Sequence, residues 1–394
     1  MTTIRVAIVA GESSGDALGA ALIDALRQRL GTQRPARPIE FRGVAGPAMR
    51  AAGCEALADA HELAVMGLIE PLRHLPRLWR LRSLLLRQLI AWTPDVFIGI
   101  DAPAFNLSLA GRFKARGIAT VQYVSPQIWA WRQGRVRKIA RRCDLVLCLL
   151  PFEPQFYASH AVHAEFVGHP LADQIPLQAD RAAARAALGL AAQSPVLALL
   201  PGSRMGEVQR LSAPFIATAM QLAQRRPDLQ LVAPTASAAV RSEFVRALQA
   251  AGAPDVRVLD GQARTALMAA DVALVASGTA SLEALLCGCP MIVAYRVSAL
   301  TALLVRALRL VRLRQFSLPN LLAGETLAPE FFQEAVIPDN LCPAIERALT
   351  DTALREHLQH RFRAIHESLR ADGAARAAQT VLALLDAREE GQLC

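Results

Sequence analysis

Two turns that follow apolar runs carry side chains able to do chemistry. Asp101 comes directly after the run Val96–Ile100 in "DVFIGIDAPAFN", and a carboxylate at the end of a strand can take a proton from an attacking hydroxyl. An aspartate that only stabilises its turn is the alternative. Another run ends in "VQYVSPQIWAWRQGR", where Trp129, Trp131 and Arg132 follow. These aromatic side chains either line a sugar or acyl site or anchor the core.

The stretch "VLALLPGSRMGEV" has the pattern of a strand, a tight turn and a helix over residues 196–208. Gly202 would let a ligand come close to the backbone, Ser203 can cap the helix, and Arg204 would supply a forked donor. Because a helix N-terminus also attracts anions, this stretch predicts a diphosphate site. An ordinary capped turn with a solvated arginine is the alternative.

The stretch "ADVALVASGTASLEALLCGCP" repeats this pattern over residues 270–290. Small residues at the start of its helix would let a phosphate approach the backbone N–H groups. They are Ser277, Gly278, Thr279 and Ala280. Glu283, one turn later, could accept hydrogen bonds from ribose hydroxyls, or could be a first-turn acid that the helix dipole favours.

The first turn of the chain raises a different question. In "IRVAIVAGESSGDALGAAL" the apolar run Ile4–Ala10 leads into a glycine-containing turn, as at many phosphate sites. This turn, however, carries Glu12 and Asp16, where a phosphate would meet negative charge. The spacing alone does not say what the turn binds.

Composition narrows the class of protein. The 394 residues suffice for two domains with a core each. The net charge of +9 rests on arginine, since the lysines are only Lys114 and Lys138. Biased composition explains this excess, or else a preference for phosphate or an anionic membrane surface does. No phosphate-binding lysine loop, dinucleotide fingerprint or nucleophile elbow is present, and no nucleic-acid-binding module is recognisable.

Cysteine and histidine usage predicts a reduced chain without a metal site. The seven cysteines show no paired CxxC spacing, and His160 and His163 have no partner ligands nearby in the sequence. The N-terminus runs directly into a predicted strand, so we expect no signal peptide. No uncharged apolar run reaches transmembrane length, so we expect a chain that does not span a bilayer.

Short apolar runs alternate with longer helical patterns in two series, separated by the Gly- and Pro-containing "EFVGHPLADQIP". This alternation predicts an α/β fold with two Rossmann-like, doubly wound domains that face a central cleft. Every motif above follows a predicted strand, where ligands of such folds bind. The predicted strands are Val6–Ala10, Phe41–Val44, Val96–Ile100, Thr120–Val124, Leu145–Leu149, Val196–Leu200, Leu229–Ala233, Val256–Leu259, Val272–Val275 and Met291–Ala294. The predicted helices include Asp180–Leu188 and Glu207–Arg225.

Two segments, residues 66–92 and 298–316, are basic and amphipathic. In the first, arginines alternate with leucines and tryptophans, a mixture that can lie in a membrane interface. The alternative is a surface helix whose arginine stems cover apolar neighbours. We favour the membrane for the first segment and protein packing for the second.

Ten motifs together give the chain a resemblance to the lipid-A-disaccharide synthase family. They run in order from residue 9 to residue 324 and read "VAGESSGDALGA", "GVAGPAM", "ELAVMGLIE", "PDVFIGIDAPAFN", "YVSPQIWAWR", "LPFEPQFY", "GHPLAD", "LALLPGSR", "SGTASLEALLCGCPMIVAYR" and "FSLPNLLAG". The resemblance implies a GT-B glycosyltransferase. Its N-terminal domain would comprise residues 1–172, its nucleotide-binding domain residues 173–365, and a helical tail residues 366–394.

The resemblance also implies a reaction and roles for residues. It would join UDP-2,3-diacylglucosamine to 2,3-diacylglucosamine 1-phosphate (lipid X) with inversion, giving a disaccharide phosphate and UDP. Asp101 matches the family's essential aspartate, which we interpret as the general base, and Arg204 matches its essential arginine, which would neutralise the departing UDP without a metal or other cofactor. Glu283 would hold the ribose, residues 277–280 the phosphates, and Asn320 matches a position used in the site or a dimer contact.

In a GT-B arrangement the first turn lies on the acceptor side. Glu12, Ser13 and Ser14 would then contact sugar hydroxyls, which their polar side chains suit better than phosphate. Because both substrates are acylated, the resemblance favours docking of residues 66–92 on the inner face of the inner membrane, in an otherwise cytoplasmic protein. The residues expected to dock are Met66, Leu68, Leu72, Leu75, Trp79 and Arg80.

Two other functions stay open from the sequence. A GT-B-fold UDP-sugar epimerase would share the nucleotide site, and a membrane-surface protein that binds UDP-sugars could have lost catalysis. Family members can form dimers by exchanging C-terminal segments, so the tail of this chain either packs back on its own N-terminal domain or is exchanged in a homodimer.

Overall fold

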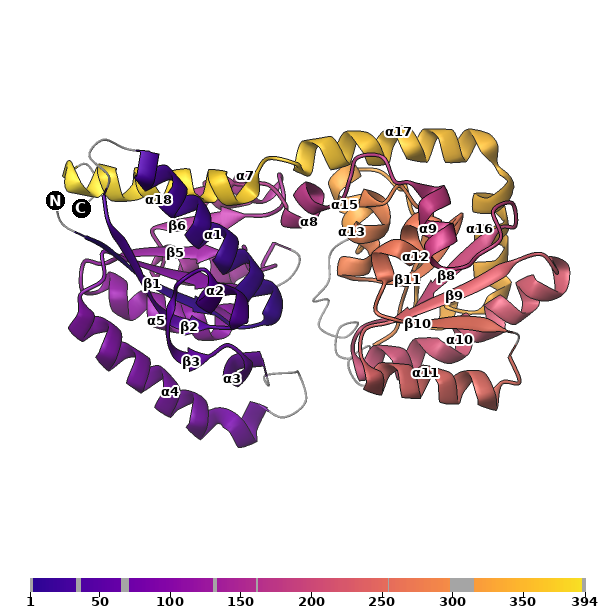
Figure 1. Cartoon of the computed structure of the whole chain (residues 1–394), viewed down its shortest axis with the longest axis horizontal. Coiled ribbons are helices and arrows are strands. Elements are labelled where there is room, and N and C mark those ends of the chain that lie inside the picture. The colour runs from indigo at the N-terminus through magenta and orange to yellow at the C-terminus, as the bar shows by residue number, and fades with distance from the viewer. Residues whose placement is uncertain are drawn as a thin grey trace. The chain divides into compact units, whose positions relative to one another are not determined.

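The computed structural model describes residues 3–32, 37–64, 71–129, 133–160, 162–253, 255–297 and 315–391. It divides the chain into two compact units (Figure 1). Unit 1 comprises Met1–Asp173 and Leu369–Cys394, and unit 2 comprises Gln174–Ser368. These boundaries differ by one to three residues from those expected, and the segment treated as a tail begins in unit 2 and ends in unit 1.

The sheet of unit 1 is parallel throughout, in the order β3-β2-β1-β4-β5-β6-β7. Apart from the added strand β7, this is the Rossmann order. Its strands are β1 (Ile4–Ala10), β2 (Ile39–Ala45), β3 (Glu55–Asp59), β4 (Val96–Ile100), β5 (Ala119–Tyr123), β6 (Leu145–Cys148) and β7 (Ala164–Phe166).

Helices cover both faces of this sheet (Figure 1). The described helices of unit 1 are α1 (Ser13–Thr32), α2 (Pro47–Ala51), α3 (His61–Ala64), α4 (Pro71–Trp92), α5 (Pro103–Lys114), α6 (Val136–Ala140), α7 (Glu153–Ala158), α8 (Pro170–Gln174, which ends in unit 2) and α18 (Gly373–Glu389), with a 3₁₀ turn at Gln133–Arg135. Even-numbered residues of β1 pack with α1 and α18, whereas Ala7 and Val9 pack with α4 and α5. Strands buried on both faces have to be apolar at every position, as β1 nearly is.

Unit 2 repeats the same order with β10-β9-β8-β11-β12-β13, again parallel. Its strands are β8 (Val196–Leu200), β9 (Gln230–Thr235), β10 (Val256–Asp260), β11 (Val272–Ala276), β12 (Met291–Tyr295) and β13 (Glu330–Phe332). Its described helices are α9 (Arg181–Ala187), α10 (Met205–Arg225), α11 (Ala238–Ala250), α12 (Ala263–Ala269), α13 (Thr279–Leu286), α15 (Leu318–Ala323), α16 (Pro338–Thr350) and α17 (Thr352–Leu369), with a 3₁₀ turn at Gln333–Ala335. Helices α10, α11 and α16 share one core with the sheet, and α12 and α13 pack on the strands as well.

The predicted α/β class with two doubly wound sheets is confirmed, and each predicted strand is present within two residues of its expected bounds. Strands β3, β7 and β13 were not predicted. Each of these is a short strand at the edge of its sheet, and none has a fully buried residue. Edge strands need no apolar run, so their sequences give no such signal.

The last helix of the chain is fastened to unit 1 by Asp173. Its Oδ1 accepts hydrogen bonds from the N–H groups of Ala371 and Asp372 (both 3.2 Å), and its Oδ2 accepts one from Gly373 N (2.8 Å). A carboxylate at these unpaired N–H groups caps α18 and opposes the positive end of its dipole. Helix α18 then places Ala377, Ala378 and Val381 in the core beside α1.

We expect Asp173→Ala to lower the free energy of unfolding of unit 1 by about 2 kcal/mol, because three N–H groups lose a charged acceptor. Urea unfolding measures the loss, and amide hydrogen exchange should speed up in α18. Asp180→Ala is the matched control, since Asp180 caps α9 in unit 2 through Ala183 N (2.9 Å). Equal exchange in α18 for both variants would contradict the assignment.

Candidate active site

In both sheets the strand order reverses next to the first strand of the unit, between β1 and β4 and between β8 and β11. Parallel pairing aligns Ala10 with Ile100 in unit 1 and Leu200 with Val275 in unit 2. The turns after these strands therefore lie side by side at the carboxyl edge of each sheet. Ligands of open α/β sheets bind at such switch points, and these turns contain most of the residues singled out from the sequence.

In unit 1 the turn after β1 touches the turn after β4. A Cβ added to Gly11 would lie 2.5 Å from the Cβ of Ala102, closer than atoms can come. Only glycine therefore fits at position 11, and it keeps the first turn of the chain against the Asp101 turn.

The backbone at the Asp101 turn is held in an unfavourable conformation. Asp101 has φ +50° and Ala102 has φ +39°, both in the left-handed region that non-glycine residues rarely adopt. The amide of the buried Asn106 donates hydrogen bonds to the carbonyls of Asp101 (2.9 Å) and Ile100 (3.1 Å), and Gln122 Nε2 donates one to Asp101 O (3.1 Å). Such strain costs roughly 1–3 kcal/mol per residue and is concentrated at functional sites.

The carboxyl of Asp101 lies half-buried at this turn. Loss of hydration raises the pKa of Asp101 above its usual range, and a hydrogen bond with the backbone of Ala102 offsets this only in part. A carboxylate with a raised pKa is a stronger proton acceptor. Asp101 is thus better suited to act as a general base than an aspartate on the open surface.

The two acids of the first turn have different surroundings. Asp16 is buried, and its carboxylate accepts hydrogen bonds from the N–H groups at the start of α2, from Gly46 (2.8 Å), Ala48 (2.8 Å) and Met49 (3.1 Å). This acid is structural. Glu12, Ser13 and Ser14 are exposed at the start of α1, so their side chains are accessible to a ligand.

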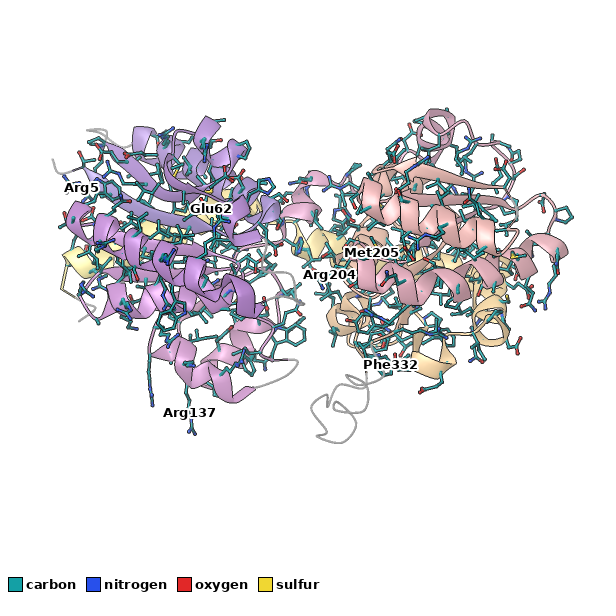
Figure 2. The ribbon with its side chains drawn as sticks, turned by 90° about the horizontal axis from the view of Figure 1, so that it is seen from below. Arg5, Glu62, Arg137, Arg204, Met205 and Phe332 are labelled. Carbon is teal, nitrogen blue, oxygen red and sulfur yellow. The ribbon has the colours of Figure 1, made fainter. Side chains whose placement is uncertain are left out.

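In unit 2, Arg204 is the N-cap of α10, which begins at Met205 (Figure 2), so the expectation that Ser203 caps this helix is wrong. Glu207, in the first turn of the helix, reaches back, and its Oε2 accepts hydrogen bonds from the N–H groups of Ser203 (3.2 Å) and Arg204 (3.3 Å). Gly202, at φ +130°, leaves room for this carboxylate, whose Oε2 would lie 2.6 Å from a Cβ there. The Arg204 side chain is 71% exposed.

The neighbouring turn after β11 also presents backbone to solvent. Gly278 and Thr279 are exposed, and Ser277 and Ala280 are half-buried, at the start of α13. Gly278 has φ +150°, at the limit of the region that favours glycine. The Ser277 hydroxyl donates to Phe316 O at 3.5 Å, so this turn contacts the segment that precedes α15.

Glu283 lies on α13 one turn further along. It is half-buried, and its Oε1 is 3.4 Å from Nε of Arg264, which also donates to Gln174 Oε1 (2.9 Å). The structure thus gives this acid a cationic partner from α12. A ribose that bound here would share Glu283 with Arg264.

Asn320 has a different environment from the other predicted residues. It is fully buried, and its amide donates to Ala328 O and Glu330 Oε1 (both 2.8 Å) while its Oδ1 accepts from the N–H groups of Leu327 (2.8 Å) and Ala328 (2.9 Å). Glu330 also accepts from Ser317 N (2.9 Å) at the start of α15. Asn320 therefore shapes the loop beside the Ser277 turn. Glu330 was not predicted from the sequence, because its partners lie 10 to 14 residues away, beyond the span of a local motif.

A buried acid at the carboxyl edge of unit 1 was likewise not singled out. Glu153 is 2% exposed and accepts hydrogen bonds from Trp129 Nε1 and Leu150 N (both 3.0 Å). Burial raises the pKa of Glu153 to about 7, although these hydrogen bonds favour the charged form. Trp129 is thus positioned by a polar partner as well as by its edge-on contact with Phe152. Trp131 and Arg132 lie outside the described residues.

The amphipathic segment 66–92 forms α4 from Pro71 on. Leu81, Leu85, Leu86 and Leu89 face the core of unit 1, whereas Trp79 is 62% exposed with the guanidinium of Arg82 over its ring at 5.1 Å. Arg80 is also exposed. Met66, Leu68, the side chains of Leu72 and Leu75, and residues 298–314 lie outside what the structure describes.

Among the described residues, no helix is long and apolar enough to cross a membrane. Within the same ranges, no three His, Cys, Asp or Glu side chains are grouped so that they could hold a metal ion. The described cysteines are buried and free.

The architecture is similar to that of solved two-domain structures. A UDP-GlcNAc 2-epimerase from Neisseria meningitidis, solved with UDP-GlcNAc, superposes with a TM-score of 0.60 at 12% identity, over 98% of this chain and 99% of that one. A sucrose-phosphate synthase from Thermosynechococcus elongatus gives 0.57 at 16% identity, over 98% and 100%. At such low identity these similarities establish the two-domain GT-B-like fold alone.

Sequence comparison goes further. The family model described as lipid-A-disaccharide synthetase matches residues 6–384. A lipid-A-disaccharide synthase from Xanthomonas campestris is 51% identical over 393 residues, covering 99% of this chain and 88% of that protein. One from Xylella fastidiosa is 48% identical over 386 residues, covering 98% and 99%. The chain therefore belongs to the lipid-A-disaccharide synthase family of glycosyltransferases.

Proposed function

We propose that the chain transfers a diacylglucosaminyl group from UDP-2,3-diacylglucosamine to 2,3-diacylglucosamine 1-phosphate, giving lipid A disaccharide 1-phosphate and UDP. Family membership supports the reaction class. The observation that carries the assignment of a base is the desolvated carboxyl of Asp101 at the switch point of unit 1.

The transfer is a single displacement. The 6-hydroxyl oxygen of the acceptor attacks the anomeric carbon on the face opposite UDP, and a new C–O bond forms as the bond to the phosphate oxygen breaks. The hydroxyl proton passes to the Asp101 carboxylate, and the electron pair of the broken bond leaves with UDP. One displacement inverts the anomeric carbon, so one general base suffices.

Residues of unit 1 serve the acceptor in this proposal. The strained Asp101 turn fixes the direction of the carboxylate, and Gly11 keeps the exposed Glu12, Ser13 and Ser14 beside it. Their carboxylate and hydroxyl oxygens hydrogen-bond sugar hydroxyls.

Residues of unit 2 serve the UDP group. The turns 202–204 and 277–280 offer backbone N–H groups at two helix starts, and Arg204 neutralises the charge that grows on the leaving diphosphate, so no metal or other cofactor is invoked. The diphosphate takes the N–H groups of Ser203 and Arg204 that Glu207 now occupies. Glu283 holds the ribose, and Asn320 positions the loop next to this site.

We further propose that the protein docks on the inner face of the inner membrane through residues 66–92. The exposed Trp79 and Arg80 on α4 support this surface, because an apolar side chain enters the headgroup region while arginines bind anionic lipid. Exchange of the C-terminal segment in a homodimer stays a prediction.

The reaction is tested by incubating the protein with both acylated sugars and assaying the disaccharide phosphate and UDP. Asp101→Asn should lower kcat by about 10²- to 10⁴-fold with UDP binding unchanged, because the amide cannot accept the proton. An ordinary aspartate has a pKa of about 3.9. Because the pKa of Asp101 is raised, this base becomes protonated at a higher pH than that. As the pH is lowered, kcat/KM should therefore begin to fall at a higher pH than it would with an ordinary aspartate as the base. Asp24→Asn, on the exposed side of α1, is the control.

Most activity retained in Asp101→Asn would remove Asp101 as the base. Turnover of the UDP-sugar without lipid X would favour the epimerase alternative. UDP binding without turnover under any condition would favour the non-catalytic one.

Arg204→Gln should weaken UDP binding and also lower kcat, because the leaving diphosphate loses a charged donor. The two effects multiplied together should amount to about 10²-fold. The free energy of unfolding should change by no more than about 0.5 kcal/mol, since the side chain is exposed. Arg246→Gln is a matched control, because Arg246 is also 71% exposed and pairs with an acid three residues away, Glu243. Equal UDP affinity in both variants would contradict the role of Arg204.

Replacing Leu72, Leu75 and Trp79 by Ser should release the protein from liposomes that contain anionic lipid and leave UDP affinity unchanged. A large apolar side chain contributes roughly 1.5–3 kcal/mol on burial, so each lost contact lowers partitioning by about 10- to 100-fold. Ile337→Ser, which removes an exposed apolar side chain from unit 2, is the control. Unchanged sedimentation of the triple variant with liposomes would overturn the docking surface.

A further inference from the structure

Unit 2 contains a cavity of about 320 Å³ that none of the proposed substrate residues lines. Asp271 stands directly before β11, and Gly288, Cys289 and Pro290 stand directly before β12, so the cavity lies at the amino edge of the sheet. The turns proposed to bind UDP follow the carboxyl ends of β8 and β11, at the opposite edge of this sheet. A five-residue strand separates the two edges by about 15 Å, so this is a separate site.

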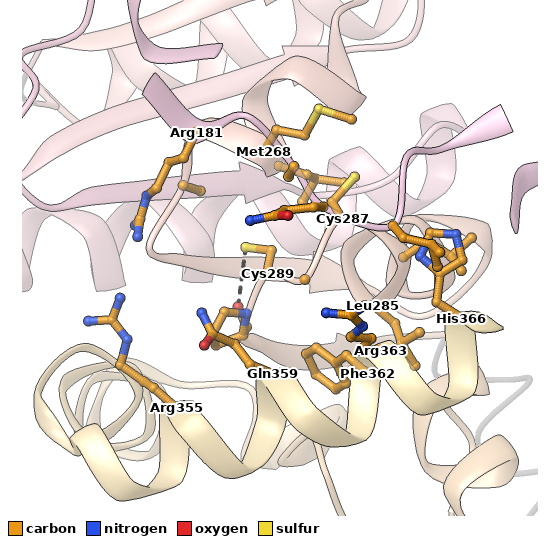
Figure 3. A pocket seen from close by; sticks show the side chains of 18 of the residues that line it. Arg181, Met268, Leu285, Cys287, Cys289, Arg355, Gln359, Phe362, Arg363 and His366 are labelled. Atoms are coloured by element: carbon orange, nitrogen blue, oxygen red, sulfur yellow. Dashed lines mark hydrogen bonds between the residues drawn. The ribbon is translucent and has the colours of Figure 1, made fainter. Parts of the chain in front are cut away.

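The cavity holds more positive than negative charge. Arg181 and Arg355 point toward one another from opposite walls, and Arg363 points into the same space (Figure 3). Asp271 is the only acid among the described residues that line it. Arg363 is 66% exposed and paired with Glu367 (3.0 Å).

Three guanidinium groups share the carboxylate of Asp271. Its Oδ1 pairs with Arg181 and lies 3.5 Å from Arg355 Nη2, and its Oδ2 lies 2.6 Å from Nη2 of the buried Arg185 and 2.8 Å from Val196 N. One negative charge thus faces three positive ones in a partly buried place. Nε of Arg181 is in addition buried without a hydrogen-bond partner in the described part of the chain.

The other lining groups add no negative charge. Burial raises the pKa of Cys287 to about 12 and that of Cys289 further, so both thiols stay neutral. Gln359 points into the cavity as a neutral donor and acceptor (Figure 3). Apolar side chains form the rest of the wall, among them Leu267, Met268, Leu285 and Phe362.

We propose that this cavity binds a phosphate dianion, either free or as the head of a small monoester. Guanidinium groups form paired hydrogen bonds with phosphate oxygens. A phosphate group carries nearly two negative charges at neutral pH, so it balances the excess of positive charge in the cavity. The volume is at the lower end of the range for ligand pockets, roughly 300–1,000 Å³, so it suits a small anion rather than a UDP-sugar. The apolar wall offers contact to the body of a monoester.

The bound anion would join the two ends of unit 2. Leu177, Gln178 and Ala179 lie on the segment by which the chain enters this unit, and Arg355 and Arg363 lie on α17, by which it leaves. A ligand that binds only the folded state raises its stability by mass action. Phosphate should therefore raise the Tm of unit 2 in a concentration-dependent way.

The test titrates the full chain with inorganic phosphate and, in a second arm, with glycerol 3-phosphate, by calorimetry at constant ionic strength and with saturating UDP. Constant ionic strength removes general screening, and UDP fills the proposed nucleotide site. We expect saturable binding in the wild type. Arg355→Gln and Arg363→Gln should each weaken it by about tenfold, the cost of one charged hydrogen bond.

Arg361→Gln is the matched control, because Arg361 lies on the same helix and pairs with Glu325 (2.7 Å) but does not line the cavity. Tighter binding of glycerol 3-phosphate identifies a monoester site, and binding of phosphate at least as tight identifies a site for the free ion. If Arg355→Gln destabilises the protein, phosphate binding by Arg363→Gln decides the test, because the side chain of Arg363 is exposed. No binding in the wild type, or equal binding in Arg361→Gln and Arg363→Gln, overturns the proposal. Because the readout is binding at this cavity, it does not depend on the proposed transfer reaction.

Discussion

The register of two parallel strand pairs determines where the functional residues of each unit lie. Ala10 pairs with Ile100, and Leu200 pairs with Val275, so in each unit two turns distant in sequence come out side by side. A slip of one residue in either pair would exchange the two faces of a strand that is buried on both sides. The apolar cores on both faces of the sheet thus fix the strand register, and the register fixes the positions of the turns. The proposed chemistry therefore depends on packing that lies away from the site.

In unit 1 one of these two turns, the turn at Asp101, has a strained backbone. Asp101 and Ala102 stay in the left-handed region because Asn106 and Gln122 hold the carbonyl oxygens there and because Gly11 leaves room for Ala102. The free energy for this strain comes from the apolar core beneath. Unit 2 uses no such device at Arg204, where the backbone is extended and a neighbouring carboxylate occupies the N–H groups. One unit holds its proposed catalytic group rigidly, and the other presents an exposed one.

Much of this arrangement is predictable from the sequence because it is local. Apolar runs followed by glycine or aspartate identify the strand ends, and strand ends identify Asp101 and Arg204. Prediction failed where a helix boundary shifts or where partners come from far away. Ser203 has the right type for a cap, but the helix begins at Met205, one residue later than such a cap would require, and Arg204 is its N-cap. Asn320 depends on Glu330 and α18 on Asp173, contacts that only the tertiary fold creates.

The return of α18 to unit 1 has a consequence for synthesis on the ribosome. The 195 residues from Gln174 to Ser368 are translated after the sheet of unit 1 and before the helix that completes its core. At about 5–20 residues per second, the face of β1 and α1 that α18 covers stays uncovered for roughly 10–40 s. Unit 2, which is continuous in sequence, can finish folding in that interval. The second unit in the chain is therefore expected to be the first to reach its native core.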